Sequence, residues 1–150
     1  MAFTVSRRTP LPPRAAWDAA TDLAEHTRHV PLTVVEVPEG GLVLGAQVSA
    51  VTRLGPFAGT DSMLVTALEP GTRLRLVKTG RLLRGWADIT VAADGEGALV
   101  EWTEELWLPG ARRLTRPLGD RLGARLFTGV LERLLARVEA AGARSPGGPA

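Results

Sequence analysis

Apolar and polar residues alternate along most of this chain, a pattern that predicts strands with one buried face. Residues 3–7 alternate in this way, and prolines follow at positions 10, 12 and 13. Residues 14–20 then carry apolar side chains at helical spacing, and residues 22–28 extend that helix or form a second short one. The strand pattern returns in six further segments, which are residues 32–37, 42–53, 61–69, 72–79, 82–92 and 98–108.

The connections between these six segments are short and rich in glycine and proline. They lie at residues 38–41, 55–56, 70–71, 80–81 and 94–95. Connections of this length join antiparallel neighbours, because parallel strands need a longer crossover. With the first segment included, the pattern predicts a seven-stranded antiparallel sheet.

The period changes after Pro109-Gly110, where apolar residues recur every four positions and predict a long amphipathic helix. Its apolar set is Leu118, Leu122, Leu126, Val130, Leu134 and Val138, joined by Phe127, Leu131 and Leu135. Residues 142–150 are rich in Gly and Pro and offer no core residue. We therefore expect one domain over residues 1–141 and a disordered tail over 142–150.

Composition places the chain among ordinary globular proteins. Its 150 residues suit one domain, with 45% hydrophobic and 23% charged residues. The net charge of +2 makes a nucleic-acid partner unnecessary, and the absence of cysteine excludes disulfides and thiolate metal sites. No apolar run reaches the roughly 20 residues of a membrane span. We expect a cytoplasmic protein that is a monomer or a homodimer.

The order of elements and three short motifs resemble a known family. The motifs are TRLGP at residues 52–56, KTGR at 78–81 and WTEEL at 102–106. They are similar to actinobacterial members of the SRPBCC, or polyketide cyclase/dehydrase-like, family of the START-related superfamily. That resemblance implies an α+β helix-grip fold, in which a curved seven-stranded antiparallel sheet wraps around the C-terminal helix and encloses an apolar cavity.

The same resemblance implies a function. Members bind lipids, quinones, hormones or polyketides, and some are aromatases or cyclases. We therefore expect a hydrophobic or aromatic small-molecule ligand between the sheet and the last helix, with cyclase-like activity left open. We expect no cofactor and no metal, and the resemblance does not favour a metal site.

Hairpin geometry assigns the two faces of the sheet. Two-residue turns at residues 70–71, 80–81 and 94–95 would pair Val65 with Leu76, Leu76 with Gly85, and Gly85 with Glu104. They would also pair Ala67 with Leu74, Leu74 with Ala87, and Ala87 with Trp102. The predicted inward set is Met63, Val65, Leu74, Leu76, Ala87, Ile89 and Trp102, and the outward set includes Arg73, Arg75, Arg84, Trp86, Asp88, Glu101, Glu105 and Trp107.

Three charged residues, Asp61, Lys78 and Glu104, interrupt this inward face toward one end of the sheet. The sequence leaves three interpretations of this group open: an ion pair at the cavity rim, a ligand-recognition group, or a catalytic acid or base. Gly85 between Lys78 and Glu104 leaves space for water or ligand. The expected ligand-binding set is Asp61, Met63, Val65, Leu76, Lys78, Gly85, Ala87, Trp102, Glu104, Phe127 and Leu131, around a void of several hundred Å³, the range of ordinary ligand pockets.

Other candidate chemistry is weaker. His26 and His29 lie near Asp22 and Glu25, but a helix this short and polar is expected on the surface, so no metal site is predicted. The chain has no nucleophile elbow, phosphate loop or dinucleotide motif. The alternative function is an interaction protein that contacts RNA, the ribosome or an anionic membrane through Arg112, Arg113, Arg116, Arg121 and Arg125.

Overall fold

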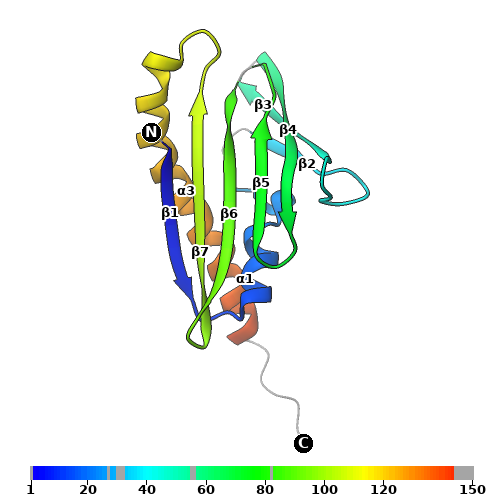
Figure 1. The fold of residues 1–150 in the computed structure, drawn as a ribbon, viewed down its shortest axis with the longest axis vertical. Helices are drawn as coiled ribbons and strands as arrows, with labels where there is room; N and C mark the ends of the chain where they lie inside the picture. Colours follow the sequence, from blue (N-terminus) through cyan, green and yellow to red (C-terminus); the bar gives the residue numbers. More distant parts are fainter. Residues whose placement is uncertain (1, 27, 30–32, 55–56, 82, 144–150) are drawn as a thin grey trace, which may run out of the picture.

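The computed structural model describes residues 2–26, 28–29, 33–54, 57–81 and 83–143. Within them the order of elements is a strand, two short helices, six strands and a long helix, as predicted (Figure 1). The elements are β1 (Phe3–Thr9), α1 (Pro13–Ala20), α2 (Leu23–His26), β2 (Thr33–Glu36), β3 (Gln47–Leu54), β4 (Phe57–Glu69), β5 (Arg73–Lys78), β6 (Arg84–Asp94), β7 (Gly97–Trp107) and α3 (Arg112–Ala143).

The seven strands form one antiparallel sheet in the order β1-β7-β6-β5-β4-β3-β2. The first strand therefore pairs with the last, and β2 forms the opposite edge. Helix α3 packs against β1 and β7 and also contacts α1 and α2 (Figure 1). This arrangement is the predicted helix-grip fold.

The core lies between the inner face of the sheet and the helices. Its fully enclosed side chains include Val65, Leu74 and Ile89 from the sheet and Leu131 and Leu135 from α3. Alternation of buried and exposed positions in β5 and β6 matches the predicted inward set.

One part of the helix prediction is wrong, because Leu122 is exposed. A helix turns by about 100° per residue, so a four-residue repeat drifts by about 40° at each step and leaves the core-facing side. The residues that pack inward follow a mixed three- and four-residue spacing. They include Phe127, Val130, Leu131, Leu134 and Leu135.

The strand registers differ from the predicted ones in a regular way. Leu76 pairs with Ala87 rather than Gly85, and Ala87 pairs with Glu104 rather than Trp102. In both hairpins the turn lies one residue later than expected, which moves every pair by two positions. Because side chains alternate with a period of two, the inward and outward faces stay as predicted.

The β4–β5 hairpin follows the prediction only in part. Val65 pairs with Leu76 as expected, and Met63 pairs with Lys78. A bulge after Val65 then shifts the register, so that Leu74 pairs with Leu68 instead of Ala67. An extra residue in one strand displaces all the pairs beyond it.

Several element boundaries also differ from expectation, including the start of β4 at Phe57 rather than at position 61. Strand β3 begins at Gln47 rather than at position 42, because Gly41 and Gly45 adopt φ of +74° and +83° and turn the chain before it. At the other end of the molecule, α3 continues to Ala143. The rest of the expected tail, residues 144–150, lies outside the described residues.

The outer face of the sheet carries the expected charged residues. Arg73 and Arg75 pair with Asp88 at 2.7 and 3.0 Å, and Arg75 also lies over the Trp86 ring. Burial alone would raise the pKa of the Asp88 carboxyl, but hydrogen bonds and charge from the two arginines outweigh it and lower that pKa. Trp86 donates to Glu105 at 3.2 Å, so this tryptophan covers the exterior as predicted.

Candidate ligand-binding cavity

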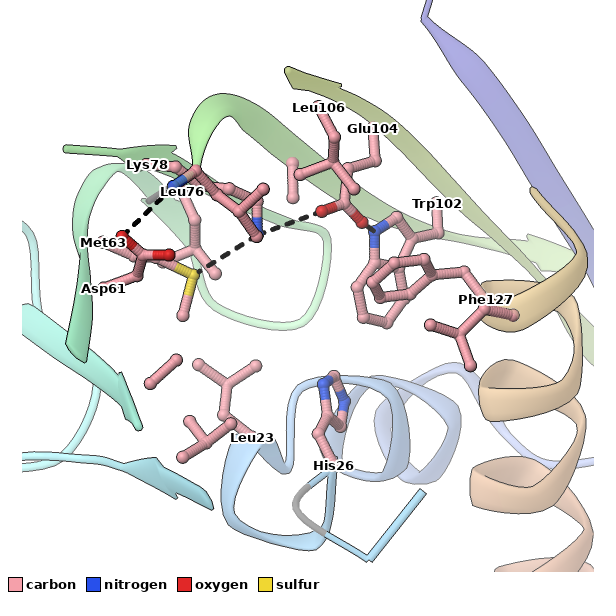
Figure 2. Close-up of a pocket in the computed structure, with 15 residues that line it drawn as sticks. Leu23, His26, Asp61, Met63, Leu76, Lys78, Trp102, Glu104, Leu106 and Phe127 are labelled. Atoms are coloured by element: carbon pink, nitrogen blue, oxygen red, sulfur yellow. Dashed lines mark hydrogen bonds and ion pairs between the residues drawn. The ribbon is translucent and has the colours of Figure 1, made fainter. Parts of the chain in front are cut away.

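A cavity of about 200 Å³ lies between the inner face of the sheet, α2 and α3 (Figure 2). It is smaller than the several hundred Å³ expected. Most of its wall is apolar, and its polar groups come from both the sheet and α2. The lining residues are Leu23, His26, Val35, Ala50, Asp61, Met63, Leu76, Lys78, Leu83, Ala87, Trp102, Glu104, Leu106, Leu126 and Phe127.

The structure brings most of the predicted site residues to this cavity. Those that line it are Asp61, Met63, Leu76, Lys78, Ala87, Trp102, Glu104 and Phe127. Val65 and Leu131 are instead enclosed in the packed core, at 1% exposure each.

Gly85 does not line the cavity either. It lies opposite Lys78 and Leu106 rather than Glu104, with φ of +143°. A Cβ atom at this position would overlap the carbonyl oxygen of Glu105. The absence of a side chain at Gly85 therefore allows the backbones of β6 and β7 to approach closely.

Lys78 and Glu104 meet above strand β6. Lys78 lies opposite Gly85, and Glu104 lies opposite Ala87, so only small residues separate the two side chains. Lys78 Nζ is 3.0 Å from Glu104 Oε1, far closer than the roughly 10 Å lateral spacing of strands two apart. The displaced registers keep the same two-residue offset between Lys78 and Glu104 along β6, but they place Gly85 rather than Leu83 opposite Lys78.

Glu104 is an interior group, whereas one of the three interpretations from the sequence placed it in an ion pair at the cavity rim. Its exposure is 0%, whereas the side chain of Lys78 is 15% exposed. Its second oxygen, Oε2, accepts a hydrogen bond from Trp102 Nε1 at 3.0 Å. The Oε1 contact with Lys78 is an ion pair without hydrogen-bond alignment. Glu104 therefore anchors both a cation and an indole at the cavity wall.

Asp61 lines the same polar end but has a different local role. Its Oδ1 accepts from the Leu83 backbone N–H at 3.2 Å, and a Cβ at Gly80 would overlap that oxygen. Asp61 thus supports the β5–β6 connection. Lys78 Nζ lies 3.7 Å from Met63 Sδ, a weak acceptor.

His26 is the most important residue that sequence reasoning placed wrongly. The residue is 4% exposed, and its ring stacks on Trp102 with centroids 5.1 Å apart. Trp102 in turn contacts Phe127 at 4.9 Å. Burial, the largest influence, lowers the pKa of His26 from 6.5 to about 4. His26 is therefore a neutral cavity residue at pH 7, not a surface residue.

Charge pairs connect α3 with the four-residue helix α2, which carries His26, and with the residue just before that helix. Glu25 lies 3.3 Å from Arg137, and Asp22 lies 3.8 Å from the same arginine. Four residues are too few for a helical period, so the sequence held no signal for the buried side of α2. Among the described residues, no group of three or more His, Asp or Glu side chains could hold a metal ion.

The basic surface of α3 is described only in part. Arg113, Arg121 and Arg125 are exposed, whereas the side chains of Arg112 and Arg116 lie outside the described set. No helix in the described ranges is long and apolar enough to cross a membrane. Association with RNA or an anionic surface stays a prediction.

Comparison with solved structures identifies the same fold elsewhere. The Zhui aromatase/cyclase from Streptomyces sp. R1128 is similar at a TM-score of 0.71 and 16% identity, with 99% of each chain covered. Ara h 8.0201 reaches 0.70 at 15% identity, over 93% of this chain and 98% of that one. TTHA0849 from Thermus thermophilus reaches 0.70 at 21% identity, over 94% and 99%.

Sequence comparison gives the family. No curated protein matches this chain significantly. The family model for polyketide cyclase / dehydrase and lipid transport matches residues 1–142, which is nearly the whole chain and agrees with the resemblance in its motifs. The chain belongs to the polyketide cyclase / dehydrase and lipid transport family.

Proposed function

We propose that this protein binds a small hydrophobic molecule of one or two rings, and that Lys78 donates a hydrogen bond to an oxygen of that molecule. Family membership and the apolar cavity support the binding of a hydrophobic ligand. The observation that carries the proposal is a lysine at the wall of this cavity, held by a fully buried carboxylate.

Cavity volume limits the size of the ligand. A dry cavity of about 150 Å³ takes up benzene, whereas drug-sized ligands occupy about 300–1,000 Å³. At about 200 Å³, this cavity matches one ring or two fused rings. A larger polycyclic ligand would require the walls to move apart.

Lys78 supplies a directed polar contact in that space. An ammonium group has three N–H donors, and Glu104 Oε1 and Met63 Sδ take up at most two of them. Leaving a donor unpaired in an apolar space is unfavourable, so a ligand oxygen that accepts from Nζ is stabilised there. The cyclase activity that the resemblance implies stays a prediction, because no side chain has an assigned catalytic role.

Binding can be tested with 2-acetylnaphthalene, a two-ring ketone. In ¹H–¹⁵N spectra, the Trp102 indole resonance should shift on titration, because Trp102 lines the cavity. The Trp86 indole, on the outer face, should not shift. Lys78→Met should weaken binding about tenfold, because the loss of one hydrogen bond from a charged donor changes the binding free energy by about that factor.

A filled cavity supplies the matched control. Ala50→Leu places a larger side chain at a lining residue, and Ala92→Leu makes the same change at an exposed position of β6. The first variant should bind at least tenfold more weakly and the second should bind like the wild type. Unchanged binding in Ala50→Leu, or equal shifts of Trp86 and Trp102, would rule out this cavity as the site.

A further inference from the structure

His26 contributes a polar atom to the cavity that the ion pair does not account for. Its Nε2 lies 3.2 Å from the carbonyl oxygen of Ala20. A carbonyl only accepts hydrogen bonds, so Nε2 must carry the proton. The neutral ring, whose pKa is about 4, then presents Nδ1 as an unprotonated acceptor.

The Nδ1 atom belongs to a ring that lines the cavity. Within the described part of the chain it has no hydrogen-bond partner, although the residue is 4% exposed and lines the pocket. It is also not among the completely enclosed side-chain atoms without a hydrogen bond, which include His29 Nε2 and Glu104 Oε1. Because the ring lines the cavity, this unpaired acceptor is available to a ligand there.

Three carboxylate oxygens along this wall already face groups of the protein. Glu104 Oε2 receives the Trp102 N–H, Glu104 Oε1 is covered by Lys78, and Asp61 Oδ1 receives the Leu83 N–H. Figure 2 shows His26 on the α2 side of the cavity, across from Lys78 on the sheet. A ligand between them therefore meets a donor at one side and an acceptor at the other.

We propose that His26 Nδ1 is the specificity-determining acceptor of this cavity, and that the ligand class is a one- or two-ring compound with a hydroxyl group, such as a phenol, that donates to it. This inference rests on the proposed function and narrows its ligand. A methyl ether of the same ring system offers no donor and would leave Nδ1 unpaired in an apolar space. Sites built around a hydrogen bond discriminate strongly against analogues that lack the group.

The test compares 2-naphthol with 2-methoxynaphthalene, which have the same rings and differ in the donor. Calorimetric titration of the wild type should give at least tenfold tighter binding of 2-naphthol. In His26→Phe, which keeps a ring against Trp102 and removes both nitrogens, the two affinities should agree within about twofold. His29→Phe is the matched control, since His29 does not line the cavity, and should keep the wild-type preference.

A spectroscopic measurement on the wild type makes the test independent of variant folding. The ¹⁵N resonance of His26 Nδ1 should shift when 2-naphthol binds and should stay in place with the ether. Equal wild-type affinities for both probes, or a preference that survives His26→Phe, would overturn the role of His26 while leaving the cavity as a binding site. Failure of every naphthalene probe to move the Trp102 resonance would overturn the proposed function, and this inference with it.

Discussion

Replacing Glu104 with Gln tests whether the Lys78–Glu104 pair is an interior structural element. Gln keeps the shape of the side chain and an oxygen for the Trp102 N–H, but it leaves Lys78 without a counter-charge. At 3.0 Å and an effective dielectric constant of about 20, the direct attraction is about 5–6 kcal/mol before desolvation is subtracted. Removing one partner of a buried pair costs about 3–5 kcal/mol.

The expected loss for Glu104→Gln lies at the lower end of that range, about 3 kcal/mol, because Lys78 is 15% exposed and retains some hydration. For a domain of this length, such a loss lowers Tm by about 6–12 °C. Lys78→Met should cost at least as much, since the carboxylate it leaves behind is fully enclosed. The double variant should lose less than the sum of the single variants, because neither charge is then stranded.

Urea unfolding followed by circular dichroism measures all three variants against the wild type. Asp18→Asn is the matched control, since Arg14 and Asp18 form a pair of similar length, 3.1 Å, whose side chains are 73% and 56% exposed. It should leave the urea midpoint unchanged. If Glu104→Gln and Lys78→Met also had little effect, and their effects were additive, the pair would behave as a surface pair and the reasoning from burial would be refuted.

The remaining predictions concern pH and packing. Folding holds the pKa of His26 near 4 while the unfolded chain titrates near 6.5, so stability should be full above pH 6.5 and fall by about 3 kcal/mol by pH 4. Urea midpoints across this range should show the loss, and His26→Phe should reduce it. Gly123→Ala should lower Tm, because its Cβ would lie 2.5 Å from Phe3 Cε1, whereas Gly129→Ala on the same helix meets nothing within 4 Å and should raise stability by up to about 1 kcal/mol. Equal Tm shifts for the two glycine variants would contradict this account.

The alternation of apolar and polar residues predicted the seven-stranded sheet and its two faces. A side-chain period of two is insensitive to a register displacement of two, so the inward placement of Lys78, Trp102 and Glu104 survived wrong turn positions. The same insensitivity hid the true cross-strand neighbours. The bulge after Val65 is a further local detail that no periodic pattern contains.

The tertiary structure alone decided how these residues form a site. The 3.0 Å contact of Lys78 with Glu104 depends on the small residues Gly85 and Ala87 beneath it, which the observed turns place there. His26 is neutral because the four-residue helix α2 packs its side chain into the interior. Charge pairs with α3 stabilise that position, and no local sequence period predicts it. Sequence patterning sets which side of a strand a residue occupies, whereas the distance between side chains and the volume they enclose follow from how distant segments pack together.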